Sequence, residues 1–327
     1  MGDFIMRRTF LAACLCAGLA LPAAALAGPQ RMVIATAGTA GALYPMGVAM
    51  AETINKHSKS LKASAEASAA SLENLRNLAS GQVEMGISQN EMAYFAYTGT
   101  GKYAGRAMKN LRSLFGTIIS WVQVFVPADS PITSIAQLKG KRVGVGAPGS
   151  GGEQAARIIL GYYGLDYQKL KAEFMGNVDM VSALKDGSLD AFFITHPLRS
   201  APLLDLATTK KVRLLPIAED GFYQAHPYYS RRLVPVKAYP GMAAAVPTAT
   251  SRIVMYTTTG ALSADQVAGL LAALWDNAGE WTGSHPAVKR YTTLQDALVG
   301  LAVPLHPGAV RFYQSRGMQV PARLLAR

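Results

Sequence analysis

The sequence predicts an α/β protein built of two doubly wound lobes that face each other across a cleft. Apolar, strand-like runs alternate with helical patterns along the 327-residue chain. The succession of strand, glycine-rich loop and helix occurs twice, with loops at residues 38–41 and 146–152. Because ligands of open α/β sheets bind outside the carboxyl ends of the strands, both loops are expected to border the cleft.

The first unit alternates strands and helices, beginning and ending with a strand. "RMVIATA", "LKASAEAS" and "VEMGIS" are its predicted strands, and the last one ends in Gln89 and Asn90. Ser71 caps the second helix, which stops at Gly81. The first helix is predicted from apolar residues at helical spacing: Leu43, Met46, Met50 and Ile54.

The second unit repeats this order. "WVQVFVP" alternates like a strand, Ser134 starts a short helix, and the strand "KRVGVGA" enters the second glycine loop. The next helix runs to Gly164, followed by the strand "KAEFM", a helix over residues 178–185 and the strands "AFFIT" and "VRLLPI". Near the end, "SRIVMYTTT" is a strand, and Ser263 with Gln266 predicts a capping box that opens an amphipathic helix.

Residues 1–27 predict a signal peptide. Arg7 and Arg8 precede an apolar run with a small-x-small end, so we expect cleavage near Ala27 and a mature chain in the periplasm. The paired arginines also resemble a twin-arginine signal, Met6 is an alternative start, and an uncleaved anchor is the competing interpretation. Both cysteines lie in this segment, which excludes disulfides, thiolate nucleophiles and Cys-ligated zinc from the mature chain.

The chain is basic, with 32 Lys and Arg against 20 Asp and Glu and a net charge of +12. Such an excess is typical of proteins that bind nucleic acid or anionic membranes. Here the basic residues form short, scattered runs without interleaved aromatic residues. We therefore expect a solvated basic surface on a protein that handles anions, and no nucleic-acid partner.

The two glycine loops have the chemistry of anion sites. Backbone N–H groups at a helix N-terminus hold carboxylates or phosphates, and glycine lets the backbone approach the ligand closely. The Ser150 hydroxyl is expected to add a hydrogen bond in the second loop, "GAPGSGG". The N–H groups come from three residues in each loop: Thr39, Ala40 and Gly41, and Ser150, Gly151 and Gly152.

Patterns for cofactors, metals and catalysis are weaker. The second loop formally matches G-x-G-x-x-G, but its first glycine lies within the strand and Pro148 occupies the turn, so no dinucleotide is predicted. Ser150 lacks G-x-S-x-G, and Ser182 with Lys185 matches S-x-x-K without its usual companion motifs. The five histidines show no metal-ligand spacing. We expect no enzyme, metal or cofactor, and an exported hydrolase using Ser150 or Ser182 is the alternative.

Six stretches are specific enough to compare with known families: "ATAGTAGALYPMG", "SLENLRNLASGQVEMGISQNEMAYFAYTGTG", "SIAQLKGKRVGVGAPGSGGE", "ALKDGSLDAFFIT", "VPT" and "PLHPGAVRFYQSRG". In this order they resemble the TAXI family, the solute-binding proteins of tripartite ATP-independent periplasmic (TRAP) transporters. The resemblance implies a type II periplasmic-binding-protein fold, with segments near residues 121–126 and 250–256 crossing between the lobes. The expected boundaries are residues 28–121 plus 253–327 for the first lobe and 122–252 for the second.

The resemblance also implies a function. It predicts a receptor that binds a small organic anion such as glutamate, glutamine or 2-oxoglutarate and hands it to membrane-embedded TRAP permease subunits. A type II binding protein serving an ATP-driven importer or a sensor kinase is the alternative, with the same fold and site.

The family's ligand-facing positions carry over onto this sequence. Leu43 stands where the family has a tyrosine, and His196 follows a strand after which the family often has a small residue, so His196 is predicted to influence ligand choice. From the residues alone, a cleft-facing and a structural role for His196 remain equally open. The predicted ligand-binding residues are Thr39, Gly41, Tyr44, Ser71, Gln89, Asn90, Ser150, Gly151, Gly152, Thr195 and His196.

Overall fold

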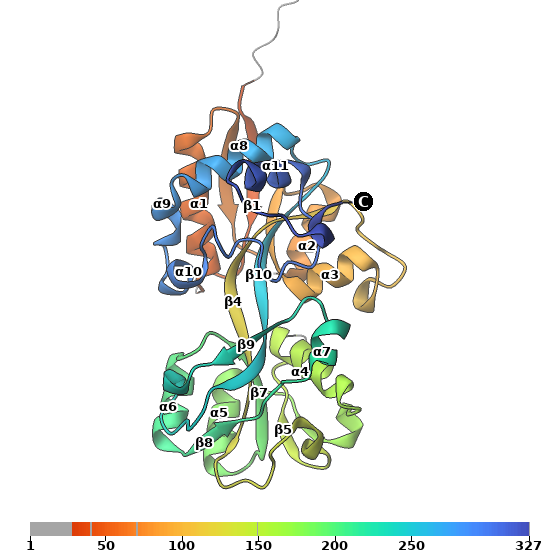
Figure 1. Ribbon diagram of the computed structural model, residues 1–327, viewed down its shortest axis with the longest axis vertical. Helices are drawn as coiled ribbons and strands as arrows, with labels where there is room; N and C mark the ends of the chain where they lie inside the picture. The colour runs from red at the N-terminus through yellow and green to blue at the C-terminus, as the bar shows by residue number, and fades with distance from the viewer. Residues whose placement is uncertain (1–27, 40, 70, 149, 327) are drawn as a thin grey trace, which may run out of the picture.

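Two lobes lie one above the other along the long axis of the molecule, and two long strands run from one lobe into the other (Figure 1). The computed structural model describes residues 28–39, 41–69, 71–148 and 150–326. The predicted signal peptide and Ala40 of the first glycine loop lie outside the described residues. Within this described part, no helix is both long and apolar enough to cross a membrane.

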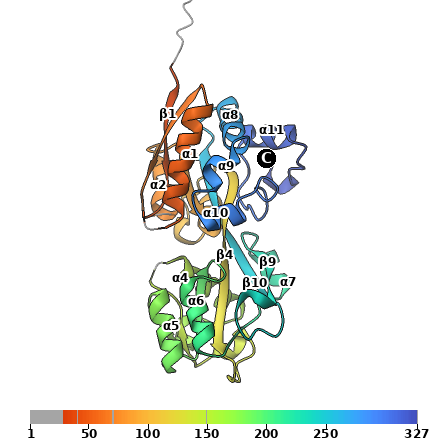
Figure 2. The same cartoon turned by 90° about the vertical axis from the view of Figure 1, so that its left-hand side faces the viewer.

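The two long strands are β4 (Leu111–Pro127) and β10 (Val246–Thr258), which contain the segments predicted to cross between the lobes. They pair antiparallel, with Trp121 opposite Thr250. In the other lobe β4 pairs with β7 (Ala191–His196) and β8 (Val212–Leu214), and β10 pairs with β9 (Ser230–Val234). Figure 2 shows β4 passing from one lobe into the other. We call the part with β1 to β3 lobe 1 and the part with β5 to β9 lobe 2. The exact lobe boundaries expected from the sequence stay a prediction.

Hydrogen bonds connect the strands of the described residues into one sheet in the order β2-β1-β3-β10-β4-β7-β5-β6, with β8 on β4 and β9 on β10. Pairs within the βαβ units are parallel, as predicted for doubly wound lobes. The strands are β1 (Gln30–Ala35), β2 (Leu61–Glu66), β3 (Met85–Gln89), β4 (Leu111–Pro127), β5 (Arg142–Gly144), β6 (Lys171–Glu173), β7 (Ala191–His196), β8 (Val212–Leu214), β9 (Ser230–Val234) and β10 (Val246–Thr258).

Helices cover the sheet in both lobes (Figure 1). Lobe 1 carries α1 (Leu43–His57), α2 (Ser71–Ser80), α3 (Asn90–Thr98), α8 (Ala264–Trp275), α9 (Ala278–Thr282), α10 (Pro286–Tyr291) and α11 (Pro307–Ser315). Lobe 2 carries α4 (Gly151–Tyr162), α5 (Asn177–Asp186), α6 (Ala201–Thr209) and α7 (Asp220–Ala225). Short 3-10 helices lie at residues 101–103, 135–138, 167–169, 236–238 and 322–324.

The core consists of separate apolar clusters. One fills lobe 1 and includes the predicted face of α1, where Met46, Met50 and Ile54 are fully buried. Lobe 2 has one cluster on each face of its sheet. Phe193 of β7 packs with α4 on one face, and Phe192 packs with α5 and α6 on the other.

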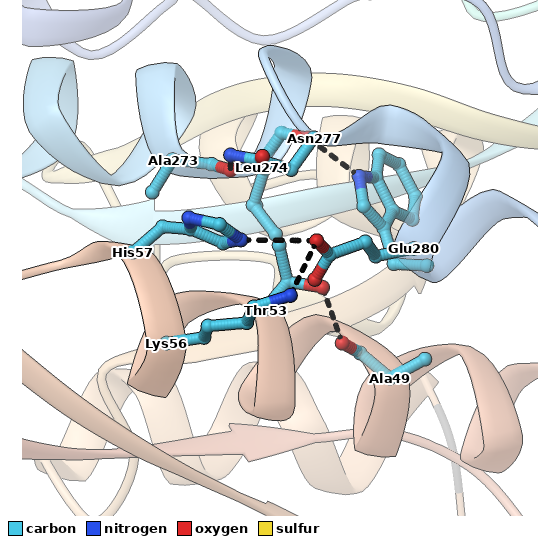
Figure 3. A network of polar contacts seen from close by, with 9 residues as sticks. Ala49, Thr53, Lys56, His57, Ala273, Leu274, Asn277 and Glu280 are labelled. Carbon is cyan, nitrogen blue, oxygen red and sulfur yellow. Dashed lines mark hydrogen bonds and ion pairs between the residues drawn. The ribbon is translucent and has the colours of Figure 1, made fainter.

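Polar contacts tie the end of α1 to α9 (Figure 3). Lys56 Nζ and His57 Nε2 lie 2.9 Å and 3.1 Å from Glu280 Oε1. These bonds, that of Lys56 first, lower the pKa of Glu280. Beside them, the indole of Trp281 donates to the Leu274 carbonyl at 2.8 Å. The contacts of Lys56 and His57 with Glu280 thus connect α1 and α9, which lie more than 200 residues apart in sequence.

The structure confirms most predicted elements and corrects two. The capping box of α8 is present, because Ser263 and Gln266 each accept a backbone N–H bond from the other. The strand predicted from "WVQVFVP" is longer, because β4 already begins at Leu111. Asn90 does not end a strand: β3 stops at Gln89, and Asn90 is the first residue of α3, a helix that the sequence patterns had not indicated.

Candidate functional site

A cavity of about 310 Å³ lies between the two lobes. Of the thirteen described residues that line it, ten come from lobe 1 and three from the start of α4 in lobe 2. The apolar lining residues are Leu43, Ala69, Leu72, Ile87, Met92 and Ile253. The polar ones are Ser71, Ser88, Gln89, Ser150, Gly151, Gln154 and Lys102. Four of the predicted ligand-binding residues are therefore in the lining: Ser71, Gln89, Ser150 and Gly151.

The second glycine loop shapes the lobe 2 wall of the cavity. Ser150 is the N-cap of α4, and its Oγ accepts the backbone N–H of Glu153 at 3.1 Å. The hydroxyl hydrogen of Ser150 remains to donate to a ligand. Gly146 has a φ of +95°, and a Cβ there would lie 2.9 Å from Glu153 N, so the loop requires glycine at this position.

Gly151 lets the two lobes meet at the cavity. A Cβ on Gly151 would lie 2.3 Å from Nε2 and 2.5 Å from Oε1 of Gln89, which belongs to lobe 1. The neighbouring Gly152 differs, because its Cβ would meet only Ser150 Oγ at 3.7 Å and Thr195 N at 3.9 Å. Gly151 is thus the position where a missing side chain allows close contact across the cleft, and Gly152 is not in the lining.

The lobe 1 wall is built from the ends of β3 and the starts of helices. Ser71, the first residue of α2, accepts the backbone N–H of Gln89 at 3.0 Å through its Oγ. Gln89 in turn is the N-cap residue of α3. Together with Leu43 of α1 and Ser150 of α4, these residues bring four helix N-termini to the cavity. The partial positive charge of helix N-termini favours an anion there.

Lys102 carries the charge that the sequence patterns missed. Among the described lining residues, it is the only ionisable one. It lies in the 3-10 helix Gly101–Tyr103 after α3 and is exposed. No motif marked it, because its position depends on how α3 and the following turn pack on lobe 1. Gln154 and Met92 were also missed, because they face the cavity only through the way in which α4 and α3 are rotated about their axes.

Asn90 is the predicted site residue whose surroundings differ most from expectation. Its side chain is fully buried, and its Nδ2 donates to the carbonyl oxygens of Tyr228 at 3.0 Å and Gly300 at 2.6 Å. Its Oδ1 accepts from Tyr256 Oη at 3.1 Å and Ala302 N at 3.2 Å. The Asn90 amide thus connects a segment of lobe 2 at Tyr228 with a segment of lobe 1 at Gly300, and Asn90 is not among the residues that line the cavity.

Thr195 and His196 end β7 and also lie outside the described lining. His196 pairs with Trp121 of β4, and strand alternation places it on the face with Phe192, covered by α5 and α6. Thr195 is on the α4 face instead. Within the described part of the chain, Oγ1 of Thr195 and Nδ1 of His196 are buried without a hydrogen-bond partner. Burial lowers the pKa of His196 below its usual value, which favours the neutral imidazole.

The described residues of the first glycine loop lie outside the cavity lining. Thr39 and Gly41 are exposed, Tyr44 is half-buried, and none of the three is among the lining residues. Leu43, which stands at a tyrosine position of the resembled family, does line the cavity. The predicted roles of all eleven residues in ligand binding, Asn90 included, stay predictions.

The geometry gives the hydrolase alternative no support. No histidine is found among the described residues around the cavity, so Ser150 has no imidazole base there. Ser182 is exposed on α5 and donates to the Val178 carbonyl at 3.2 Å, while Lys185 pairs with Asp205. Across residues 28–39, 41–69, 71–148 and 150–326, no group of three or more His, Cys, Asp or Glu side chains is placed to hold a metal ion.

A second, larger cavity of about 730 Å³ also borders both lobes. It lies between the segment around Tyr229 and Ser230 and the C-terminal segment around Leu298 and Arg323. Neither glycine loop reaches it, and none of the predicted ligand-binding residues lines it.

Comparisons with known proteins agree with the observed fold. The chain is similar to a TctC solute-binding protein from Polaromonas solved without ligand, with 17% identity over 81% of this chain and 88% of that chain and a TM-score of 0.51. It is also similar to a Xanthomonas citri protein bound to ATP, with 15% identity over 87% and 94% of the two chains and a TM-score of 0.54. A third similar structure, the periplasmic aliphatic sulphonate binding protein SsuA from Escherichia coli, is 16% identical over 90% and 91% of the chains, with a TM-score of 0.48.

The first two likenesses show that the chain has the mixed α/β, two-lobed fold of periplasmic binding proteins. A family model matches residues 34–317, from β1 to the end of α11 and the turn after it. On this match over most of its length, the chain belongs to the NMT1-like family.

Proposed function

We propose that this chain is an exported receptor that binds a small organic anion between its lobes in the periplasm and delivers it to a membrane transporter. One observation carries the proposal: residues of both lobes line one cavity, and Gln89 of lobe 1 contacts the backbone of Gly151 in lobe 2 there. A ligand in this cavity contacts both lobes. Since a ligand shifts an equilibrium only through its differential affinity, these contacts favour the closed arrangement.

An anion is the proposed ligand class because of the electrostatics of the cavity. Four helix N-termini and Lys102 face it, and each favours negative charge. The solute-binding name of the TctC protein supports a receptor rather than an enzyme. The proposed protein therefore returns its ligand chemically unchanged.

The transporter is proposed to be of the TRAP type, on the resemblance to the TAXI family. Residues 1–27 are proposed to direct export, with cleavage near Ala27. An ATP-driven importer is the competing partner, because the same fold and cavity serve both. Reconstituting the receptor with each transporter type in vesicles tests this directly: uptake that needs an ion gradient supports the TRAP assignment, and uptake that needs ATP contradicts it.

Ligand binding is tested on mature protein that has been unfolded, freed of ligand and refolded. Thermal unfolding is recorded against a panel of amino acids, 2-oxo acids and dicarboxylates, including glutamate, glutamine and 2-oxoglutarate. A ligand at 100 times its dissociation constant adds about 2.7 kcal/mol to the stability. A stabilising organic acid that is recovered intact supports the proposal. A panel without effect on verified refolded protein, or turnover of the bound compound, contradicts it.

A further inference from the structure

We infer that the interlobe cavity selects an organic acid with one negative charge, an apolar body and no ammonium group, such as an aliphatic 2-oxo acid. This inference rests on the proposed function, because it names the ligand class of the same cavity. It differs from the amino acids and dicarboxylates that the TAXI resemblance suggests. Four features of the cavity carry it: its single cation, the engagement of nearby acids elsewhere, its apolar wall and its neutral polar groups.

The cavity offers one counterion for one carboxylate. Lys102 is the only charged side chain among the described residues that line it. The internal residues that the structure leaves undescribed are Ala40, Ala70 and Gly149, none of which has an ionisable side chain. A second carboxylate on the ligand would lose water without meeting a second cation, which is unfavourable.

An amino acid ligand would need a carboxylate for its ammonium group, and the nearby glutamates are engaged elsewhere. The Glu73 carboxylate accepts the backbone N–H of Ala69, just before α2, at 2.7 Å. Glu153 is buried in the first turn of α4 and pairs with Arg157 at 2.6 Å. Glu91 is fully buried and accepts a bond from Ser251, and burial raises the pKa of Glu91, which favours its neutral form.

The remaining lining suits an apolar body with a neutral oxygen. Leu43, Leu72, Ile87, Met92 and Ile253 form an apolar wall contributed by lobe 1. Gln89 and Gln154 offer amide donors from opposite lobes, which suit a carbonyl oxygen. At about 30 Å³ for each water-sized group, the 310 Å³ volume has room for about ten such groups, the size of a small aliphatic acid.

Four compounds separate the alternatives, because they combine either an oxo or an ammonium group at carbon 2 with either an apolar or a carboxylate side chain. These are 4-methyl-2-oxopentanoate, leucine, 2-oxoglutarate and glutamate, titrated into ligand-free wild-type protein in a calorimeter. We expect 4-methyl-2-oxopentanoate to bind most tightly. Leucine, with its ammonium, and 2-oxoglutarate, with its second carboxylate, should each bind at least about tenfold more weakly, and glutamate should bind weakest.

The role of Lys102 is tested with the same assay. Lys102→Met keeps most of the side-chain length but removes the charge, and it should weaken binding of 4-methyl-2-oxopentanoate at least about tenfold. Lys102→Arg should retain most of the affinity. Lys139→Met is the matched control, because it removes one exposed lysine outside the cavity lining and should leave the affinity unchanged.

The outcomes distinguish this inference from the proposed function. Equal or tighter binding of leucine, glutamate or 2-oxoglutarate overturns the inference, as does unchanged affinity in Lys102→Met, while the receptor function stands. If wild-type protein binds none of the four compounds, the inference is overturned. The wider organic-acid panel then decides the proposed function: a stabilising acid supports it, and a panel without effect contradicts it.

Discussion

The two lobes begin alike in sequence but contribute unequally to the cavity. Each opens with strand, glycine loop and helix, yet lobe 1 supplies ten of the thirteen described lining residues and lobe 2 only three, all from the start of α4. Lys102 and the whole apolar lining belong to lobe 1. Under the proposed function, this difference predicts that lobe 1 selects the ligand and that lobe 2 closes over it with one helix N-terminus.

The largest effect on ligand binding is expected from a substitution that pushes the lobes apart where Gly151 meets Gln89. In Gly151→Ala, the added Cβ overlaps the Gln89 amide, which must move out of the cleft. We expect ligand affinity to fall by about 1–3 kcal/mol, the typical cost of overpacking a close contact. Titration calorimetry measures the loss.

Gly152→Ala is the matched control for this variant. It adds the same methyl group to the same helical turn, where ordinary contact distances of 3.7 Å and 3.9 Å are available. Both variants gain a similar helix propensity, so only Gly151→Ala should lose affinity. Adding Gln89→Ala to Gly151→Ala removes the overlap and should restore closure in part. Equal affinities of the two glycine variants would contradict the assigned contact.

The stability of lobe 1 in acid is expected to depend on His306. The Nδ1 atom of His306 caps α11 by accepting the Gly308 N–H at 3.1 Å, and burial lowers the pKa of His306 to about 4. A lowered folded-state pKa means that the unfolded chain binds the proton more readily, so stability is lost as the pH falls below about 6.5.

The expected loss is on the order of 1–3 kcal/mol between pH 6.5 and 4. His306→Asn keeps a capping acceptor but does not titrate, so it should flatten this part of the stability profile. Denaturant unfolding at a series of pH values measures both proteins. The same slope in wild type and variant would show that other groups cause the acid sensitivity.

A smaller effect is expected at Ser150, which both caps α4 and lines the cavity, and a matched variant distinguishes these two roles. Ser150→Ala removes the cap and a lining hydroxyl, so it should lower both stability and ligand affinity by about 1 kcal/mol each. Ser263→Ala removes the corresponding cap of α8, far from the cavity, and should lower stability alone. If both variants keep wild-type affinity, the Ser150 hydroxyl does not contact the ligand.

The smallest effect is expected at His196. The sequence-based hypothesis makes His196 a determinant of ligand choice, whereas its position on the α5 and α6 face argues for a change in affinity below about 0.5 kcal/mol. His196→Gln, assayed against the four-compound panel, decides between them. An altered ranking of the compounds would restore His196 to the site and weaken the assignment of selection to lobe 1.

Local patterns in the sequence were sufficient to predict most of the helices and strands. The apolar spacing of α1, the Ser263 capping box and the glycine loop before α4 each follow from interactions within about ten residues. Ser150 and Gly151 were predicted as site residues from the glycine loop at a helix start, and Ser71 and Gln89 from the resemblance to the TAXI family; all four line the cavity.

The remaining site residues depend on packing between distant segments. Lys102 reaches the cavity only through the path of the chain after α3, which no motif encodes. Asn90 looked available in sequence, but its amide is used by Tyr228 and Gly300, more than 130 residues away. For His196, the alternation of side chains along β7 decides which face of the sheet it lies on. A shift of one residue in the expected end of this strand therefore reverses the face predicted for His196.

The central claim is that the ligand bridges the lobes and closes them, and an interlobe distance tests it most directly. Residues 28–327 contain no cysteine, so in this part of the chain labels attach only at introduced sites. Exposed Lys59 of lobe 1 and Lys139 of lobe 2, each changed to Cys and spin-labelled, report the distance. Adding the tightest-binding acid should shorten this distance in wild type, and much less in Gly151→Ala. An unchanged distance in wild type, at a concentration where calorimetry shows full binding, would contradict closure by a bridging ligand.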